Sequence, residues 1–166
     1  NNTDGIQAES GSQPTITGNT FTGNTRPVSV YAARINNTIS GNTYSGNTKD
    51  YIEVQGDYID DNGTFVWAKD NGPYIVVGDV YVQRANNSSH ISTLQIANGT
   101  TVKFNSGIYL FIGGSSTNYK GALTATGVTF TSLDSTGWNG IRFYNYADDA
   151  SCLLDSCVIE NAVNGI

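Results

Sequence analysis

The acidic residues between Asp57 and Gly63 are the first candidates for chemistry in this sequence. Asp57, Asp60 and Asp61 come just before Asn62-Gly63, and oxygen-rich loops of this kind suit a hard cation such as calcium. The spaced Asp-x-Asp-x-Asp-Gly pattern of calcium loops is absent, and aspartate in a turn commonly accepts hydrogen bonds from nearby backbone. We therefore expect a structural turn here, with calcium as the weaker alternative and no other cofactor.

A second acidic group, Asp148, Asp149 and Asp155, is the other candidate for acid–base catalysis. Polysaccharide lyases and hydrolases need clustered carboxylates with a lysine or arginine nearby, and neither acidic group has such a partner in the local sequence. His90, the one histidine, lies in Asn-Asn-Ser-Ser-His, which is typical of a surface loop. The sequence therefore predicts a protein that is not an enzyme.

Two cysteines, Cys152 and Cys157, complete the set of reactive side chains. They are too few for a zinc site. We expect Cys157 to be a buried free thiol, and a Cys152–Cys157 disulfide is the less favoured alternative.

Aromatic residues near predicted turns are the remaining candidates for ligand binding. Trp67, Trp138, Tyr144 and Tyr146 fall at such places, where an aromatic face can stack on a sugar ring. Core packing is an equally open interpretation for Trp138. Six Asn-x-Ser/Thr sequons are permitted glycan sites on an extracellular protein, although chance explains most of them in a chain this rich in Asn, Ser and Thr. The sequons begin at Asn1, Asn36, Asn62, Asn86, Asn87 and Asn98.

A short internal repeat is the strongest pattern in the chain. Residues 16–25 read Ile-Thr-Gly-Asn-Thr-Phe-Thr-Gly-Asn-Thr, and residues 39–48 repeat them with conservative changes only, at an offset of 39 − 16 = 23. Identical residues in successive coils of a stacked repeat share one environment, so we expect Asn19 and Asn42 to lie one above the other. A looser copy of the frame near the C-terminus aligns Ile159 with Phe21 and Cys157 with Asn19. The predicted structural ladder is therefore Asn19, Asn42 and Cys157.

A repeat this short cannot bury its own inner face and must stack on copies of itself as a β-solenoid. Apolar residues two apart, as in Val28-Ser29-Val30 and Val102-Lys103-Phe104, have the strand period, and Gly-Asn steps suit tight corners. The apolar run from Tyr74 to Val82 suits a strand buried on both faces. The fold class is thus all-β, a parallel solenoid with coils of about 23 residues and about seven coils in all.

We expect a single solenoid segment over residues 1–166. Regular coils occupy 1–50, irregular coils with longer loops occupy 51–90, and further coils occupy 91–166. The formal net charge of −6 argues against a nucleic-acid partner, because the 8 basic residues form no patch. No apolar run has the length of a membrane span, so no membrane insertion is expected within this segment.

Four blocks of the later sequence carry a family likeness: Ser92–Phe104, Gly127–Ser132, Gly137–Phe143 and Leu153–Asn161. Together they resemble the right-handed parallel β-helix repeat proteins of bacterial and archaeal cell surfaces. In that family coils like those of residues 5–48 follow such a series, whereas here they come first, so the resemblance covers nearly the whole chain in rotated order. It implies a right-handed parallel β-helix and says little about ligand, because fold does not imply function.

The expected function is a structural or adhesive module of an extracellular or cell-surface protein, such as an adhesin, stalk or filament. Residues 161–166 mirror residues 1–6 in spacing, and neither end carries a polar cap. Copies are therefore expected to associate end to end, as tandem repeats in one polypeptide or as separate subunits. The alternative is a carbohydrate-binding or polysaccharide-degrading β-helix protein with surface glycans as partners.

Overall fold

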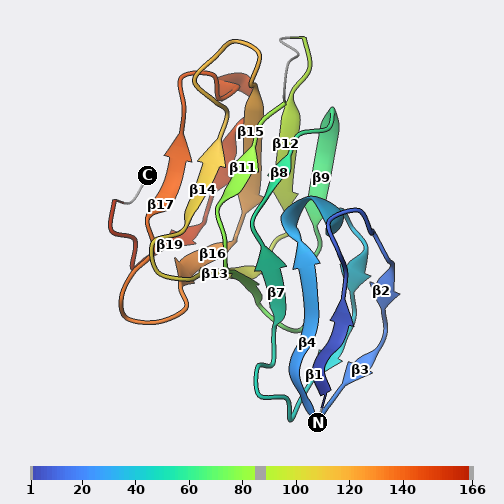
Figure 1. The fold of residues 1–166 in the computed structure, drawn as a ribbon. Coiled ribbons are helices and arrows are strands. Elements are labelled where there is room, and N and C mark those ends of the chain that lie inside the picture. The colour runs from blue at the N-terminus through green and yellow to red at the C-terminus, as the bar shows by residue number, and fades with distance from the viewer. Residues whose placement is uncertain (1, 85–88, 165–166) are drawn as a thin grey trace.

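The chain forms an all-β, parallel β-solenoid of about five turns, with a spacing of about 28 residues and 4% helix. Its computed structural model describes residues 2–84 and 89–164. The first coils lie around the N-terminus at one end of the molecule and the last coils at the other (Figure 1). Most of the described residues are strands or tight corners, as a sequence rich in Asn, Thr, Gly and Ser favours.

One seven-stranded sheet runs along the whole solenoid, in the order β1-β4-β7-β10-β13-β16-β19. All of its pairings are parallel, so the chain runs in the same direction each time it returns to this sheet. The strands are β1 (Asn2–Gln7), β4 (Asn24–Tyr31), β7 (Ile52–Gln55), β10 (Tyr74–Val76), β13 (Thr101–Phe104), β16 (Thr129–Ser132) and β19 (Val158–Ile159).

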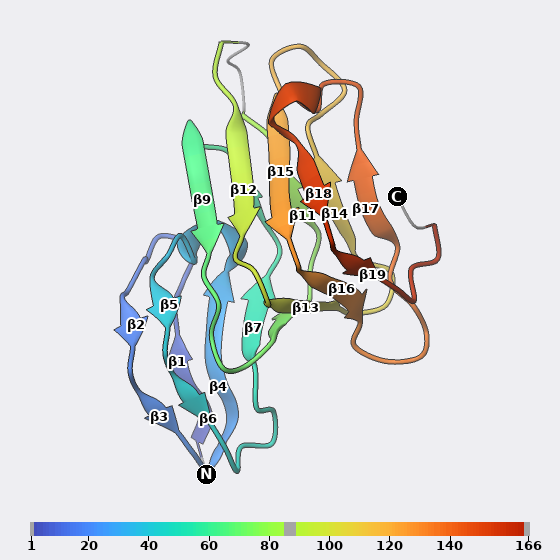
Figure 2. The ribbon, with the colours of Figure 1, turned by 180° about the vertical axis from the view of Figure 1, so that it is seen from behind.

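Two four-stranded sheets form the other walls of the later coils. The first, the β8–β17 sheet, contains β8 (Asp57–Ile59), β11 (Val80–Val82), β14 (Tyr109–Ile112) and β17 (Gly140–Phe143). The second, the β9–β18 sheet, contains β9 (Gly63–Trp67), β12 (Ser92–Ile96), β15 (Gly121–Thr126) and β18 (Leu153–Asp155), and its strands lie side by side in Figure 2.

The first two coils are narrower, because short segments replace these walls. Strand β2 (Ile16–Thr17) pairs with β5 (Ile39–Ser40), and β3 (Thr20–Phe21) pairs with β6 (Thr43–Tyr44). The 3₁₀ helix η1 (Ala32–Arg34) contacts β8, and η2 (Asp149–Ser151) contacts β15.

The sequence distance between stacked residues increases along the solenoid. Ile16 pairs with Ile39, an offset of 39 − 16 = 23, as the repeat predicts. Thr101 pairs with Thr129, an offset of 129 − 101 = 28. The 23-residue coil therefore describes the first coils only. The later coils are longer because strands such as β12 and β15 have five and six residues where β2 and β3 have two.

The core is a stack of inward-facing apolar columns. One column of the seven-stranded sheet takes a residue from every coil, and its members from Val28 to Phe130 are fully buried. It consists of Ile6, Val28, Ile52, Tyr74, Val102, Phe130 and Ile159. Ile159 thus stacks in the column of Val28 and not in that of Phe21. The C-terminal frame read from the sequence was wrong, because the longer later coils break the multiple of 23.

The apolar run from Tyr74 to Val82 forms two strands in different sheets and not one strand. Residues of β10 are buried on both faces, as predicted, but the chain turns between β10 and β11. At this corner Gly78 stacks on Gly56 so closely that a Cβ at Gly56 would lie 2.7 Å from the carbonyl oxygen of Asp79. The two glycines therefore permit the sharp turn between the seven-stranded sheet and the β8–β17 sheet.

Candidate functional site

Asn19, Asn42 and Asp70 form a hydrogen-bonded ladder at one corner of successive coils. The backbone N–H and side-chain Nδ2 of Asn19 donate to Oδ1 of Asn42 at 3.0 and 3.2 Å. The corresponding groups of Asn42 donate to Asp70 Oδ1 and Oδ2 at 2.7 and 3.0 Å. Asn42 is fully buried, and its Nδ2 also donates to the carbonyl of Ile16 at 2.8 Å. The ladder thus satisfies polar groups that the corner would otherwise leave unpaired.

A second ladder lies at the next corner, where Asn24 donates to Asn47. Its backbone N–H and Nδ2 reach Oδ1 of Asn47 at 3.0 and 3.2 Å, and Asn47 donates from both groups to Asp50 Oδ1 at 3.0 and 2.8 Å. All four ladder asparagines follow a glycine whose φ lies between 65° and 71°, namely Gly18, Gly23, Gly41 and Gly46. The repeated Gly-Asn-Thr motif therefore encodes both ladders.

Cys157 is not a member of either ladder. Its thiol lies 3.4 Å from the carbonyl of Ala125, and the neighbouring Val158 pairs with Thr129. The predicted equivalence of Cys157 and Asn19 is wrong, because it depended on the same C-terminal alignment that placed Ile159 with Phe21. Cys152 and Cys157 are both free thiols and half-buried, and burial raises the pKa of Cys152.

Asp70 accepts the last hydrogen bonds of the Asn19–Asn42 ladder. The sequence pattern does not predict this role, because Asp70 lies outside the 23-residue repeat. Besides the two groups of Asn42, its carboxylate accepts the backbone N–H of Asn71 at 2.9 Å and the hydroxyl of Tyr44 at 2.8 Å. Burial and the nearby Asp70 carboxylate raise the pKa of Tyr44, and likewise that of Tyr74, well above the ordinary tyrosine value. With four hydrogen bonds accepted, the Asp70 carboxylate closes the ladder.

The sequence-predicted calcium residues do not converge. Oδ1 of Asp57 accepts the N–H of its neighbour Tyr58 at 2.8 Å, as a turn aspartate does. The backbone carbonyl of Asp61 accepts the hydroxyl of Ser92 at 2.6 Å. Within residues 2–84 and 89–164, no group of three or more His, Cys, Asp or Glu side chains is placed to hold a metal ion. The calcium alternative for Asp57, Asp60 and Asp61 is therefore not supported by the geometry.

Both tryptophans belong to the core and cannot contact a sugar. Trp67 and Trp138 are fully buried. The indole N–H of Trp67 donates to the carbonyl of Ala32 at 3.2 Å, and Trp138 stacks on Phe104 with ring centroids 4.1 Å apart. The prediction of a sugar contact is therefore wrong for Trp67, and for Trp138 the alternative of core packing is the one that the structure shows. An aromatic ring of this size gains more from core burial than from exposure at a corner.

Tyr144 belongs to a stack of aromatic rings on the outer side of the β8–β17 sheet. Tyr58, Tyr81 and Phe111 stack with centroids 4.7 Å apart, and Tyr144 lies 5.5 Å from Phe111. The guanidinium of Arg142 also lies over the Tyr144 ring, at 4.9 Å. The rings thus cover one another's faces, and sugar stacking needs an open face. Tyr146 is half-buried and takes no part in these stacks among the described residues.

The charged residues on the early part of the seven-stranded sheet pair with one another. The guanidinium of Arg26 binds both carboxylate oxygens of Asp4, at 2.6 and 2.9 Å, and Oε1 of Glu53 at 2.7 Å. Lys49 lies 3.4 Å from the other oxygen of Glu53, which is buried. These carboxylates raise the pKa of Arg26 further, so the cluster is a closed network of opposite charges.

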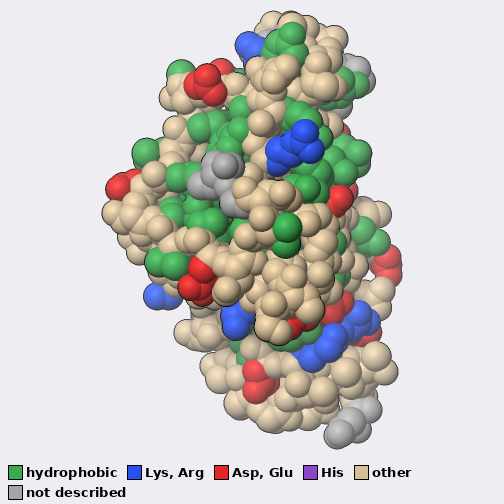
Figure 3. All heavy atoms as spheres, turned by 90° about the vertical axis from the view of Figure 1, so that its left-hand side faces the viewer, with side chains coloured by type: hydrophobic (Ala, Val, Ile, Leu, Met, Phe, Trp, Pro, Cys, Tyr) green, Lys and Arg blue, Asp and Glu red, His purple; other side chains and the backbone are tan. Residues whose placement is uncertain are grey.

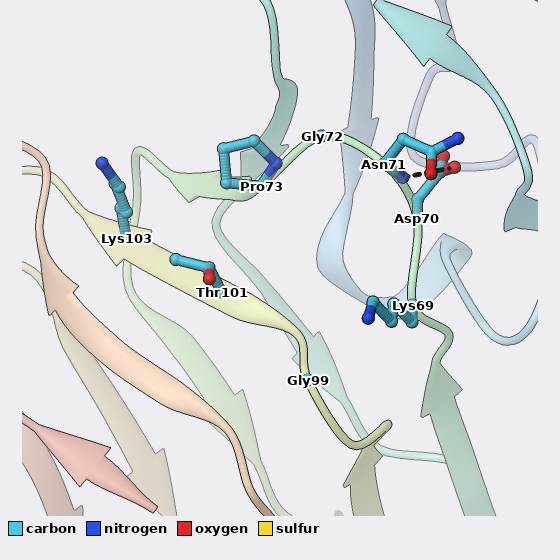
Figure 4. Close-up of a pocket in the computed structure, with 8 residues that line it drawn as sticks. All are labelled: Lys69, Asp70, Asn71, Gly72, Pro73, Gly99, Thr101 and Lys103. Atoms are coloured by element: carbon cyan, nitrogen blue, oxygen red, sulfur yellow. Dashed lines mark hydrogen bonds between the residues drawn. The ribbon is translucent and has the colours of Figure 1, made fainter.

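A cavity of about 510 Å³ opens where the β9–β18 sheet gives way to the seven-stranded sheet. Lys69 and Lys103, from successive coils, lie on either side of Thr101 and Pro73 (Figure 4). Asp70 also borders it, but its oxygens are bound as described above. This cavity was not predicted, because its basic residues lie 34 positions apart (103 − 69) and meet only through the coil register.

The sequons differ in their surroundings. The Asn36 side chain accepts the backbone N–H of Val66 at 3.1 Å and is thereby engaged in the fold, whereas Asn62 and Asn98 are exposed. Asn1, Asn86 and Asn87 lie outside the described residues.

Comparison with protein-family models, curated proteins and solved structures finds no match to this chain. Within the described ranges, no helix combines the length and the apolar character that crossing a membrane requires.

Proposed function

We propose that this chain is a structural and adhesive β-solenoid module of an extracellular surface protein, stalk or filament, extended end to end by further coils. One observation carries the proposal: the seven-stranded sheet and its inner apolar column run without interruption from β1 to β19. The Asn ladders and the Arg26 network stiffen the early coils around this column. Such a rod transmits force and spaces other domains.

The last coil supports the end-to-end part of the proposal. Leu153, Val158 and Val163 are 50%, 49% and 66% exposed, and β19 is an outermost strand of its sheet. Figure 3 shows hydrophobic side chains gathered over the upper half of one face, where the last coils lie. Exposed apolar side chains beside an unpaired strand edge favour pairing with another strand.

The opposite end is less exposed than the sequence suggested. In the first coil Ile16 and Phe21 are only 2% and 8% exposed, so that end offers a strand edge with little apolar surface. We therefore propose a head-to-tail contact between unlike surfaces, in which β19 of one unit meets β1 of another and Ile159 extends the column to Ile6.

Self-association against concentration tests the proposal. We expect light scattering and electron microscopy to show linear oligomers, and Val158→Lys to weaken them, because Val158 is an exposed apolar residue on the outer side of β19, beside the contact. Gln95→Lys, an exposed change in mid-solenoid on β12, is the matched control and should leave assembly intact. A wild-type chain that stays monomeric at millimolar concentration would refute the end-to-end contact and favour an isolated binding module.

A further inference from the structure

We propose that the cavity between Lys69 and Lys103 binds a small hydroxylated anion, such as a sugar unit that carries one carboxylate or sulfate. This inference goes beyond the structural role and does not depend on it. It rests on the charge state, position and size of the cavity.

Lys69 and Lys103 differ from Arg26 and Lys49 in having no ionic partner among the described residues. Arg26 and Lys49 are bound to Asp4 and Glu53. In the parts of the chain that the structure describes, neither Lys69 nor Lys103 lies within ion-pairing distance of a carboxylate. The cavity is therefore lined by these two ammonium groups, in a chain whose formal net charge is −6.

The register explains why Lys103 stays unpaired. Glu53, Ile75 and Lys103 occupy one column on the outer side of the seven-stranded sheet, with Ile75 between the two charges. Two strand spacings separate their backbones by about 9.6 Å, and the Glu53 carboxylate is already bound by Arg26 and Lys49. Lys103 is therefore held apart from the acidic cluster and beside the cavity.

The corner at Gly99 leaves room for the Lys69 side chain. Gly99 has a φ of 72°, and a Cβ there would lie 3.0 Å from the ammonium nitrogen of Lys69. The absence of a side chain lets the ammonium lie over this corner, toward the cavity side in Figure 4. A positively charged group is thus present at each side of Thr101.

The remaining lining defines the chemistry of the ligand. Asp70 also borders the cavity, so the lining carries two positive charges and one negative charge, and the Asp70 oxygens are engaged by four donors of the protein. The Thr101 hydroxyl can pair with a ligand hydroxyl, and Pro73 offers an apolar surface, whereas Nδ2 of Asn71 is already bound to the carbonyl of Asn42 at 2.6 Å. A volume of about 510 Å³ accommodates a sugar unit.

Titration of the folded chain with defined probes tests the site by calorimetry or amide NMR shifts. The probes are glucuronate, glucose 6-sulfate and neutral glucose, at low and high sodium chloride. We expect saturable binding of at least one acidic sugar, weakened by salt because the lysines are accessible to solvent. The tighter of the two acidic probes identifies the anionic group. Binding of glucose as tight as that of both acidic sugars, or no saturable binding of any probe, would overturn the proposal.

Substitutions of the two cavity lysines test whether the probes bind in this cavity. Lys69→Gln and Lys103→Gln should each weaken binding about tenfold, since each removes a charge-assisted hydrogen bond. Lys103→Arg keeps the charge and should retain binding, and Lys120→Gln, outside the cavity, is the matched control. Equal affinity in the two cavity variants and wild type would refute the site. Val158→Lys should bind normally, so failure of the assembly proposal and failure of this one are separable.

Discussion

At the scale of single residues, the side chains at the coil corners determine how the early coils stack. Asn42 receives two hydrogen bonds from Asn19 and makes two to Asp70 while fully buried. Asn19 makes the same donor contacts but is exposed. One residue type at equivalent corners therefore carries different energetic weight in different coils.

Replacing Asn42 should destabilise the fold more than replacing Asn19. Asn42→Ala leaves the carbonyl of the buried Ile16 without its side-chain donor, which costs about 1–3 kcal/mol of unfolding free energy. Asn19→Ala removes the same side chain at an exposed position and should cost less. Urea denaturation of both variants measures the difference. Equal losses would show that burial of the ladder does not set its contribution.

The Tyr44–Asp70 contact predicts a loss of stability at alkaline pH. The raised pKa of Tyr44 means that the folded state favours the neutral phenol, so its contribution is present below the unfolded pKa of about 10 and is lost as pH rises toward the folded pKa. Wild type should therefore lose more unfolding free energy than Tyr44→Phe between about pH 9 and about pH 12. Tyr74→Phe tests the second raised pKa in the same way. Parallel pH profiles for wild type and both variants would contradict the interpretation.

At the scale of elements, stacked rings hold the outer side of the β8–β17 sheet. Phe111 contacts Tyr81, Tyr109 and Tyr144 and is 6% exposed, whereas Tyr58 contacts only Tyr81 in the stack and is 50% exposed. Aromatic pairs on neighbouring strands contribute to sheet stability beyond the area they bury. The centre of the stack should therefore matter more than its end.

The difference in exposure between Phe111 and Tyr58 predicts a difference in the stability of their variants. Phe111→Ala should cost about 3–5 kcal/mol, as large-to-small changes at buried aromatic positions do. Tyr58→Ala, at the open end of the same column, should cost about 1 kcal/mol. Thermal or urea unfolding of the two variants measures both values. A Tyr58 variant as unstable as the Phe111 variant would mean that the stack has no protected centre.

The sequence predicts elements well where the repeat is short and fails where coil length changes. Alternation at Val28-Ser29-Val30 and Val102-Lys103-Phe104 identified strands with their inner residues buried. The Gly-Asn-Thr motif identified the Asn19–Asn42 corner. The register between stacked strands is set by both the hydrophobic pattern and the corner geometry. No local sequence pattern predicts the change from the 23-residue coil to the longer one.

The same limit explains what was missed at the candidate sites. Trp67 and Trp138 stand near corners in the sequence, yet their rings point into the core, because a wider coil needs larger side chains to fill it. Asp70 meets Asn42 across one coil, and Lys69 lies beside the same cavity as Lys103 from the next. Contacts between coils of unequal length are fixed only by the whole solenoid.

At the scale of the whole molecule, the solenoid is narrow at its first coils and wider at its last. Polar ladders occupy the early corners, ion pairs lie on the early strands of the seven-stranded sheet, and apolar side chains are exposed on the last coil. Stability of a repeat protein is close to a sum of its coils and their interfaces. The two ends should therefore differ in strength as well as in chemistry.

Metal ions should not contribute to this stability. The carboxylates of Asp4, Glu53 and Asp70 are bound by protein donors, and within the described ranges the residues Asp57 to Asp61 do not converge. The melting temperature should therefore be the same in calcium and in excess chelator. A rise in melting temperature that saturates with calcium would reveal a site formed by some other set of oxygens.

The Asn ladders make the early coils a unit that can be copied. Asn19 and Asn42 each donate two hydrogen bonds to the next coil, and in the described residues no donor reaches Oδ1 of Asn19, whereas Asp70 accepts and donates nothing onward. A duplication of one 23-residue segment would therefore insert a coil whose asparagines fit between existing ones, lengthening the rod by about 4.8 Å. A duplication of the coil that carries Asp70 would set two acceptors against each other. The chain can thus evolve new lengths by copying its first coils, whereas copying the coil that carries Asp70 would interrupt the ladder.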